Sequence, residues 1–210
     1  MSAVSQSSLA QRHDPWNKGH LIGQKCPLKS KDVWTIRVRL QLESRKRDLA
    51  LFNLTIDSKL RGCDLVRLRI DDVWIGGRVR ERATVTQKKT GRPVQFELTE
   101  QTRASIQDWL ARLSVCGTHY LFPSRCKAKP HLSTRQYARI VHGWVTSAGL
   151  ESSAYGTHSM RRTKAAQIYK KTGNLRAVQL LLGHTKLEST VRYLGIEVDD
   201  ALTISEQVDL

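Results

Sequence analysis

The sequence predicts an α+β, mainly helical fold with one small antiparallel β-sheet. Helical periodicity with polar caps dominates, and it is clearest in the carboxyl half of the chain. Residues 82–98 instead alternate apolar and polar side chains, with the two-residue period of half-buried strands. The 210 residues, 40% of them hydrophobic, suffice for one proper core. We therefore expect one principal domain with short additions at its ends.

Residues 1–29 differ in composition from the rest of the chain. They are rich in Ser, Gln, Gly and basic side chains and carry no sustained periodicity, which is typical of segments that cannot bury a core. Pro27 marks a turn before the regular structure begins. We expect a flexible basic amino-terminal arm over residues 1–29.

Three helices are expected after the arm. The first should begin at a Ser30 cap, and the second should follow the basic run 45–47 and extend through Ile56. Both are predicted to be core elements. The apolar residues of the first are Val33, Trp34, Ile36 and Leu40. A third, short helix should span Leu65 to Ile70 and end before the acidic pair 71–72.

The alternating segment predicts a β-hairpin. One strand begins at Arg82, and its partner carries apolar side chains at 94, 96 and 98. The turn between them is Lys88-Lys89-Thr90-Gly91, in which Gly91 supplies the positive φ that such a turn needs. Lys88 and Lys89 should therefore lie at a projecting tip.

The carboxyl half is expected to form a series of short helices. Their predicted starts are a Thr99 cap, a capping box of Ser133 with Gln136, a Thr157 cap, and a capping box of Thr185 with Glu188. The helix that Ser133 starts should close at Gly149, and the one that Thr157 starts should end near Gly173. A further helix is expected over 175–182, before Gly183.

Charge is the strongest compositional signal. The chain carries 35 Lys and Arg against 19 Asp and Glu, a formal charge of +16, which attracts polyanions and makes nucleic acid the first partner to consider. No run is long and apolar enough to span a membrane, and the four cysteines lack disulfide or zinc spacing. We expect a cytoplasmic, nucleoid-associated protein without a metal site. The basic arm over residues 1–29 is consistent both with a disordered leader and with a segment that contacts DNA.

Two short patterns point to phosphate chemistry. His158 and Arg161 lie three residues apart in the first turns of a predicted helix, where a cation, a proton carrier and free backbone amides would meet an anion. Alone, this pair more often marks an ordinary solvated helix start. Tyr193 follows His184 by nine residues. It falls outside the expected apolar stripe of its helix, which consists of Leu187, Val191 and Leu194.

Six positions together resemble a known family. They are Arg61 in KLRGCDL, Lys89 in KTG, His158 and Arg161 in HSMR, His184 in LLGH, and Tyr193 in VRY. In this order they resemble the tyrosine recombinase (phage integrase) family, over its catalytic domain. Lys89 is preferred to Lys88 because it directly precedes Thr-Gly. Around Arg61 the chain departs from the usual small residue followed by Ser-Glu, although Asp64 keeps the carboxylate.

The resemblance implies a DNA-breaking and -rejoining enzyme that needs no cofactor. Arg61 and Arg161 would clamp the non-bridging oxygens of a phosphodiester. Tyr193 would attack phosphorus and form a 3′-phosphotyrosine, leaving a free 5′-hydroxyl. His158 would handle the tyrosine proton, Lys89 would protonate the leaving oxygen, and His184 would donate a hydrogen bond to the phosphate.

Further basic side chains are expected to contact double-stranded DNA, with ordinary solvated charge as the alternative. They are Arg135, Arg139, Arg162 and Lys164. The domain division that follows is an arm over 1–29, a catalytic domain over 30–196, and a tail over 197–210 that packs on its own domain or on a neighbour. We expect a homo-oligomer on DNA, with an accessory protein as a possible source of the amino-terminal grip that typical family members carry.

Two other functions fit the same residues. One is a catalytically silent DNA-binding regulator with this fold, which the six chemically competent residues disfavour. The other is a stand-alone relaxing enzyme of the type IB topoisomerase kind, which shares the chemistry and needs no synapsis. The sequence predicts site-specific recombination or integration ahead of both. It does not identify the DNA site or distinguish integration, excision, inversion and resolution.

Overall fold

The fold is that of a computed structural model that describes residues 24–113, 117–125 and 129–195, together with Glu206. The predicted α+β, mainly helical fold is confirmed. The elements in chain order are α1 (Ser30–Leu42), α2 (Lys46–Ser58), α3 (Gly62–Leu65), α4 (Ile70–Val73), β1 (Trp74–Ile75), β2 (Arg78–Val79), β3 (Arg82–Thr86), β4 (Pro93–Glu97), α5 (Glu100–Leu113), α6 (Thr134–Ser147), the 3₁₀ turn η2 (Ser152–Ala154), α7 (Thr157–Thr172), α8 (Leu175–Leu182) and α9 (Leu187–Leu194).

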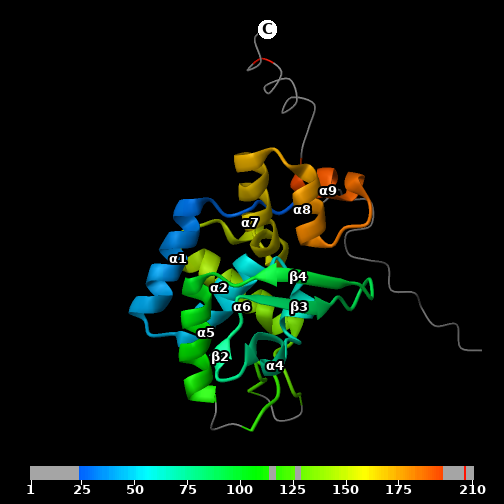
Figure 1. The fold of residues 1–210 in the computed structure, drawn as a ribbon. Coiled ribbons are helices and arrows are strands. Elements are labelled where there is room, and N and C mark those ends of the chain that lie inside the picture. The colour runs from blue at the N-terminus through cyan, green and yellow to red at the C-terminus, as the bar shows by residue number, and fades with distance from the viewer. Residues whose placement is uncertain (1–23, 114–116, 126–128, 196–205, 207–210) are drawn as a thin grey trace, which may run out of the picture.

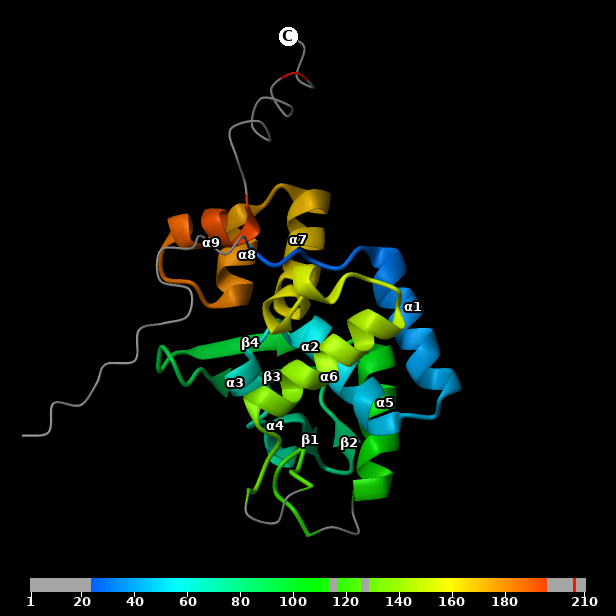
Figure 2. The ribbon, with the colours of Figure 1, turned by 180° about the vertical axis from the view of Figure 1, so that it is seen from behind.

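Helix α2 is the centre of the main core. Its residues from Ala50 to Ser58 are all buried, because α1, α5, α7 and β4 all pack against it. Seen from behind, α6 crosses in front of α2 (Figure 2). Two contacts join these helices: the Phe52 and Trp144 rings meet edge to face at 5.2 Å, and the Thr55 and Tyr137 hydroxyls lie 2.5 Å apart.

The sheet content is small and antiparallel. β3 pairs with β4 over five residue pairs, from Arg82 with Glu97 to Thr86 with Pro93, and Gly91 in the turn has a φ of 65°, as the alternation and the turn sequence predict. A second pair, β1 with β2, was not foreseen from the sequence. Strands of two residues are too short to show a period. The β3–β4 hairpin projects from the body of the fold beneath α8 (Figure 1).

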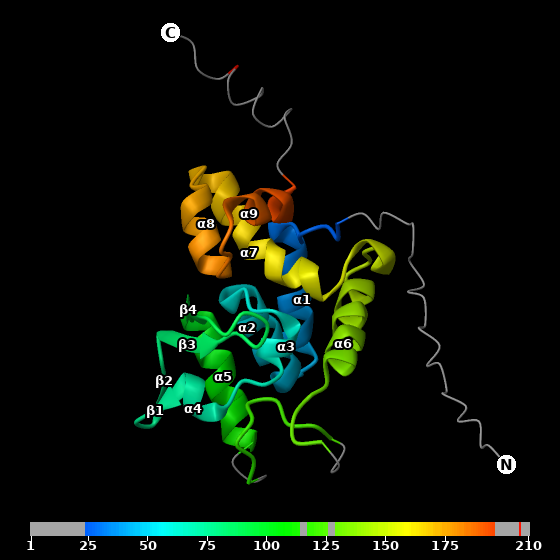
Figure 3. The ribbon, with the colours of Figure 1, turned by 90° about the vertical axis from the view of Figure 1, so that its right-hand side faces the viewer.

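The last three helices form a second, smaller cluster. Ala165, Val178 and Leu182 are fully buried there, and Tyr193 packs against them. Figure 1 shows α7, α8 and α9 gathered at one end of the molecule, above the hairpin. In the view from the side, α3 lies between the hairpin and α6 (Figure 3). The junction of the two cores is thus lined by α3, the hairpin and α7–α9.

Several local predictions need correction. The N-cap residues of α1 and α7 are Lys29 and Gly156, not Ser30 and Thr157 as predicted. Both helices therefore begin one residue earlier than expected. No capping box forms before α9, because its first residue follows Lys186 and no side chain caps it. The Ser133 cap of α6 is confirmed, since its hydroxyl accepts from the Gln136 amide at 3.1 Å.

The extent of one helix and the burial of one side chain were also predicted wrongly. The helix expected over 65–70 is split, because α3 ends at Leu65 and a new helix, α4, starts at Ile70 and contains the acidic pair expected to follow it. Trp34 is 64% exposed although it was expected in the core. The helical period places a residue on a face, but it does not decide how wide the covered part of that face is.

The ends of the chain are described only in part. Residues Gln24 to Lys29 of the expected arm pack on the domain: the Cys26 amide donates to the Ala154 carbonyl at 3.1 Å, and the Leu28 amide donates to the Thr163 hydroxyl at 3.0 Å. Residues 1–23 and nearly all of the predicted tail lie outside the described residues. Within the described helices, none is long and apolar enough to cross a membrane.

Candidate active site

The six residues singled out from the sequence come from five places in the chain. Arg61 directly precedes α3, Lys89 lies in the β3–β4 turn, His158 and Arg161 lie in the first turns of α7, His184 follows α8, and Tyr193 lies on α9. These elements meet at the junction of the two cores. The fold therefore gathers side chains that are up to 132 residues apart in sequence, from Arg61 to Tyr193.

The two arginines are held through a shared network. The Arg61 guanidinium donates to the side-chain oxygen of Gln87. Arg161, which is 3% exposed, donates to the Leu182 carbonyl at 2.7 Å, and Gln87 donates to the same carbonyl at 3.3 Å. Burial lowers the pKa of Arg161 to about 10, which leaves the guanidinium charged at neutral pH. Two cations are thus fixed side by side.

Tyr193 packs against the guanidinium groups of Arg161 and Arg162. Its ring centroid is 5.6 Å from the Arg161 guanidinium carbon and 5.4 Å from that of Arg162. The His184 ring meets the Tyr193 ring edge to face, with centroids 5.4 Å apart. The tyrosine hydroxyl is 3.4 Å from the backbone carbonyl oxygen of His158, a long contact. The hydroxyl therefore lies at the amino-terminal end of α7.

The protonation states follow from burial and positive charge. Burial raises the pKa of Tyr193 to about 12, although the nearby arginines oppose the shift. Burial and the charges of Arg161 and Arg61 lower the pKa of His184 to about 4. The pKa of His158 is lowered by the same causes. At neutral pH the phenol is protonated and both imidazoles are neutral.

His184 is oriented by a residue that sequence reasoning missed. Its Nδ1 is 3.1 Å from the hydroxyl of Thr190, which is fully buried. The predicted apolar stripe of α9 is wrong at Leu187, which is 42% exposed, while Leu194 packs on the second core as expected and Thr190 is fully buried. A threonine on a short helix carries no periodic signal. The bond with His184 explains why a polar residue faces inward there.

The hairpin is fixed beside Arg61. Asp64 is buried, and one of its carboxylate oxygens accepts from the Lys88 backbone amide at 2.9 Å. The Lys89 ammonium is one of the charges that lower the pKa of His158, after burial and the arginines. The Lys88 side chain instead lines a neighbouring hollow with Cys63 and Arg67. The choice of Lys89 over Lys88 as the lysine of the site stays a prediction from the sequence.

A groove of about 1520 Å³ opens beside the tyrosine, with walls from α7, α8, α9 and the segment before α1. His158 and Tyr193 both line it. Among the described residues, no group of three or more His, Cys, Asp or Glu side chains is placed to hold a metal ion.

The four residues expected to contact DNA fall into two groups. Arg135 and Arg139 are exposed one turn apart on α6, as a DNA contact requires. Arg162 is only 6% exposed, and it donates to the Lys25 carbonyl at 2.8 Å and covers the Tyr193 ring. Its position indicates support of the tyrosine rather than a surface contact.

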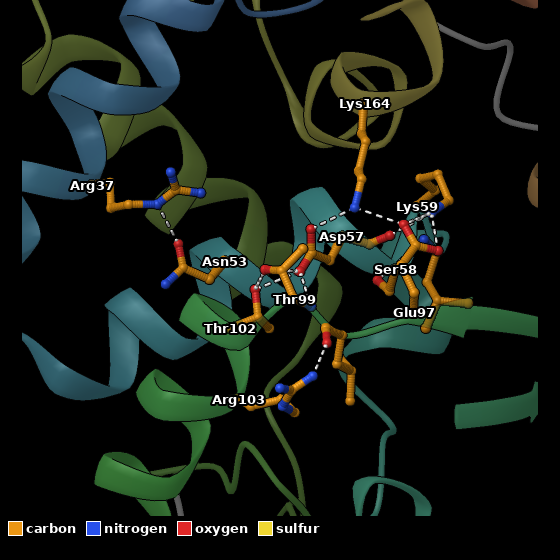
Figure 4. Close-up of polar contacts among 12 residues, drawn as sticks. Arg37, Asn53, Asp57, Ser58, Lys59, Glu97, Thr99, Thr102, Arg103 and Lys164 are labelled. Carbon is orange, nitrogen blue, oxygen red and sulfur yellow. Dashed lines mark hydrogen bonds and ion pairs between the residues drawn. The ribbon is translucent and has the colours of Figure 1, made fainter. Parts of the chain in front are cut away.

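Lys164 faces away from the site. Its ammonium lies 2.8 Å from Asp57 and 2.6 Å from Glu97 (Figure 4). Because two carboxylates already neutralise the Lys164 ammonium, its charge is not available for a contact with DNA. The sequence does not indicate this pairing, because Asp57 and Glu97 are 107 and 67 residues away from Lys164 in the chain.

Comparison with known proteins identifies the family of the chain. Residues 28–198 match the Phage integrase family. Probable integrase/recombinase YoeC of Bacillus subtilis is 30% identical over 158 residues, which are 75% of this chain and 82% of that protein. Tyrosine recombinase XerC of Neisseria gonorrhoeae is 30% identical over 155 residues, which are 73% of this chain and 48% of XerC. The chain thus spans about half the length of the XerC relative.

Solved structures share the fold. The crystal structure of XerA recombinase superposes with a TM-score of 0.73 at 19% identity, over 89% of this chain and 66% of that one. That of XerH site-specific recombinase bound to its difH substrate gives 0.67 at 20% identity, over 86% and 53%. With the sequence match over most of its length, the chain belongs to the phage integrase family of tyrosine site-specific recombinases.

Proposed function

We propose that residues 30–196 form a catalytic domain that breaks and rejoins double-stranded DNA through a covalent 3′-phosphotyrosine at Tyr193, in the service of site-specific recombination. The observation that carries the proposal is the half-buried tyrosine packed against Arg161, beside a second fixed cation at Arg61. Among the described residues, no Asp or Glu forms an ion pair with either arginine. A phosphodiester supplies the missing negative charge.

The arginines would act as the phosphate clamp. A pentacoordinate phosphorane carries more negative charge on its non-bridging oxygens than the phosphodiester does, so fixed guanidinium groups favour it over the ground state. Buried donors are most effective here because the surrounding medium screens them weakly. The positions of Arg61 and Arg161, fixed before DNA arrives, support this role.

The tyrosine needs help to lose its proton. With a pKa of about 12, the phenol is protonated at neutral pH, so attack on phosphorus requires a proton acceptor. His158 is neutral there because its pKa is lowered, and we assign it as that acceptor. Its ring does not contact the phenol in this structure, but such contacts commonly tighten only in the substrate complex.

The remaining groups complete the transfer. As the Tyr193 oxygen bonds to phosphorus, the bond from phosphorus to the 5′-oxygen breaks, and Lys89 gives that oxygen a proton. The product is a 3′-phosphotyrosine and a 5′-hydroxyl, and rejoining is the reverse reaction. If the Thr190 hydroxyl donates to Nδ1 of His184, then Nε2 carries the ring proton and can donate to a phosphate oxygen.

DNA would lie across the face that carries α3, the hairpin and the start of α6. Arg135 and Arg139 are exposed there, and Arg67, Lys88 and Lys129 line a hollow beside Ser133. These side chains would grip phosphates without reading bases. Because strand exchange joins two duplexes, we also propose that several copies of the chain assemble on DNA.

Covalent trapping tests the proposal. Wild-type protein and Tyr193→Phe are incubated without added metal with nicked suicide substrates taken from DNA that flanks the gene. We expect a denaturation-resistant protein–DNA band in the wild type that is absent in Tyr193→Phe. Tight binding without a band would contradict the enzyme and favour a silent regulator. Relaxation of any supercoiled plasmid without a defined site would favour a topoisomerase.

A further inference from the structure

Gln87 joins the parts of the proposed active site although it is not one of its six residues. It directly follows β3, at the start of the hairpin turn, and is 1% exposed. Its side-chain oxygen accepts from the Arg61 guanidinium and, at 2.9 Å, from the Thr90 hydroxyl. Its side-chain nitrogen donates to the Leu182 carbonyl at 3.3 Å. All the capacity of the oxygen and one donor of the nitrogen are used inside the protein.

The Leu182 carbonyl is the point where the second arginine joins. Arg161 donates to the same oxygen at 2.7 Å. That carbonyl is the last of α8, and the next residues are Gly183 and His184. One amide group therefore connects the Arg61 guanidinium, the Arg161 anchor, the turn that carries His184 and the hairpin that carries Lys89.

The close approach of α8 to the hairpin requires Gly183. The φ of this residue is +63°, and a Cβ there would lie 2.4 Å from a methyl carbon of Val94 and 3.1 Å from the Gln87 side-chain nitrogen. Both the backbone conformation and the available space exclude a larger residue. Packing at Gly183 thus brings the backbone at the end of α8 against Gln87. This packing holds the Leu182 carbonyl within reach of the Gln87 side-chain nitrogen.

We propose that Gln87 is a positioning residue that orients the Arg61 guanidinium and couples it to the end of α8 and to the hairpin. This inference rests on the proposed function of the site. The chemistry demands an amide: one end must accept from a cation while the other donates to a carbonyl. A methionine fills the same volume but makes neither bond, and a carboxylate would neutralise Arg61 and repel the Leu182 carbonyl.

The chain offers a matched control. Asn53 is also a buried amide, 1% exposed, that accepts from an arginine and donates to a second group. Its oxygen accepts from Arg37 at 2.8 Å, and its nitrogen donates to the Ser105 hydroxyl at 3.1 Å. Figure 4 shows the Arg37–Asn53 contact, and none of these side chains touches the six site residues. Asn53→Leu therefore removes an equivalent amide without disturbing the site.

The first test compares single-turnover cleavage of a nicked suicide substrate at saturating DNA. Because small displacements of catalytic groups cost on the order of 100-fold in rate, we expect Gln87→Met to cleave about 10- to 100-fold more slowly than wild type. Its dissociation constant for intact DNA should stay within about 3-fold of wild type. Asn53→Leu should cleave at the wild-type rate, even if it lowers the melting temperature as much as Gln87→Met does.

A double-mutant cycle separates positioning from general structural damage. If Gln87 acts through Arg61, then Gln87→Met should slow the Arg61→Ala enzyme by less than about 3-fold, because the group it positions is already gone. A loss of 10-fold or more in that background, or equal slowing by Asn53→Leu, would overturn the inference. So would a wild-type rate in Gln87→Met. If the wild-type protein forms no covalent complex, the proposed function fails, and this inference fails with it.

Discussion

Arg161 and Lys164 lie one turn apart on α7, yet they enter two clusters that differ in charge balance. Lys164 binds Asp57 and Glu97, and Glu97 also binds Lys59 at 3.0 Å. Thr99 and Thr102 donate hydrogen bonds to Asp57, at 2.7 and 2.6 Å between the oxygens. Figure 4 shows this network at the meeting of α2, β4 and α7. It holds two cations and two carboxylates.

The cluster around Tyr193 has no such balance. Arg61, Arg161 and Arg162 donate to amide or carbonyl oxygens, and among the described residues no carboxylate forms an ion pair with any of them. The charge of Asp64 raises the pKa of Arg161, although the two side chains form no ion pair. Uncompensated positive charge is therefore concentrated on one side of α7.

Opposite pKa shifts record this difference. Burial would lower the pKa of Lys164, but its bonds to Asp57 and Glu97 outweigh that effect and raise the pKa. Burial lowers the pKa of Arg161 to about 10, and the charge of nearby Asp64, with which it forms no ion pair, does not outweigh that effect. A buried cation without a partner costs stability, so its retention is typical of a site that binds an anion. The balanced cluster stabilises the fold, and the unbalanced one carries the free positive charge that the proposed phosphate clamp requires.

The largest effect is expected when one arginine of the unbalanced cluster, Arg161, is replaced. Arg161→Met should lower the single-turnover cleavage rate by about 100- to 1000-fold, as loss of one preorganised donor does. Its free energy of unfolding should change by less than about 1 kcal/mol, because the lost bond is offset by relief of a desolvated charge. Cleavage kinetics and urea unfolding measure the two effects. Normal cleavage would place the phosphate clamp elsewhere.

Removing Lys164 should have the reverse effect. Lys164→Met leaves Asp57 and Glu97 short of a cation, and the free energy of unfolding should fall by about 1–3 kcal/mol. The estimate lies below the usual cost of breaking a buried pair because the Lys164 and Glu97 side chains are 21% and 38% exposed. Cleavage by the folded protein should be unchanged. If Lys164→Met is as stable as wild type but binds DNA poorly, the cluster is not structural.

Salt dependence distinguishes surface contacts from internal ones. Arg135→Ala and Arg139→Ala should each reduce the slope of log affinity against log salt by about 0.9, one phosphate contact apiece. Lys164→Met should leave the slope as in wild type, since its charge is used inside the protein. Fluorescence anisotropy with a labelled duplex over a range of NaCl concentrations measures all three. Identical slopes in all four proteins would remove α6 from the DNA-binding face.

The two clusters should also respond to acid in different pH windows. The pKa of His184 falls from 6.5 to about 4 on folding, so the unfolded chain takes up the proton first. The free energy of unfolding should therefore decrease as pH falls from 6.5 to about 4. Asp57 and Glu97 have lowered pKa values from 3.8 and 4.5, so their stabilisation is lost only at lower pH.

His184→Gln provides the comparison for this window. Removing the imidazole should make the decrease between pH 6.5 and 4 shallower, with the part due to His158 remaining, while the loss below pH 4 stays as in wild type. Urea unfolding at half-unit pH intervals measures both. An unchanged profile above pH 4 would mean that His184 does not have the lowered pKa on which its role as a neutral donor depends.

The sequence predicted the elements whose signals are local. α8 was expected over the residues it occupies, and glycines at 173 and 183 end their helices with positive φ as expected. The hairpin was predicted from its alternation and its turn. These features depend on neighbours within a few residues, so periodicity and turn chemistry are enough to find them.

What the sequence did not reveal depends on distant contacts. Gln87 and Thr190 are polar residues buried by partners in other elements, Leu182 and His184. Lys164 reads as one more basic side chain beside the site until the fold brings Asp57 to it. The charge balance that separates the two clusters is therefore invisible in the sequence, although the six site residues could be named from it.

Identification of the residue that becomes attached to DNA tests the central claim most directly. The covalent complex formed on a nicked substrate would be digested and its modified peptide sequenced by mass spectrometry, with the label on either DNA end reporting which strand terminus is held. We predict a nucleotide adduct on Tyr193 through a 3′-phosphate, with a free 5′-hydroxyl on the other fragment. An adduct on Tyr155, Tyr169 or another residue, or attachment through a 5′-phosphate, would contradict the assignment of this cluster as the active site.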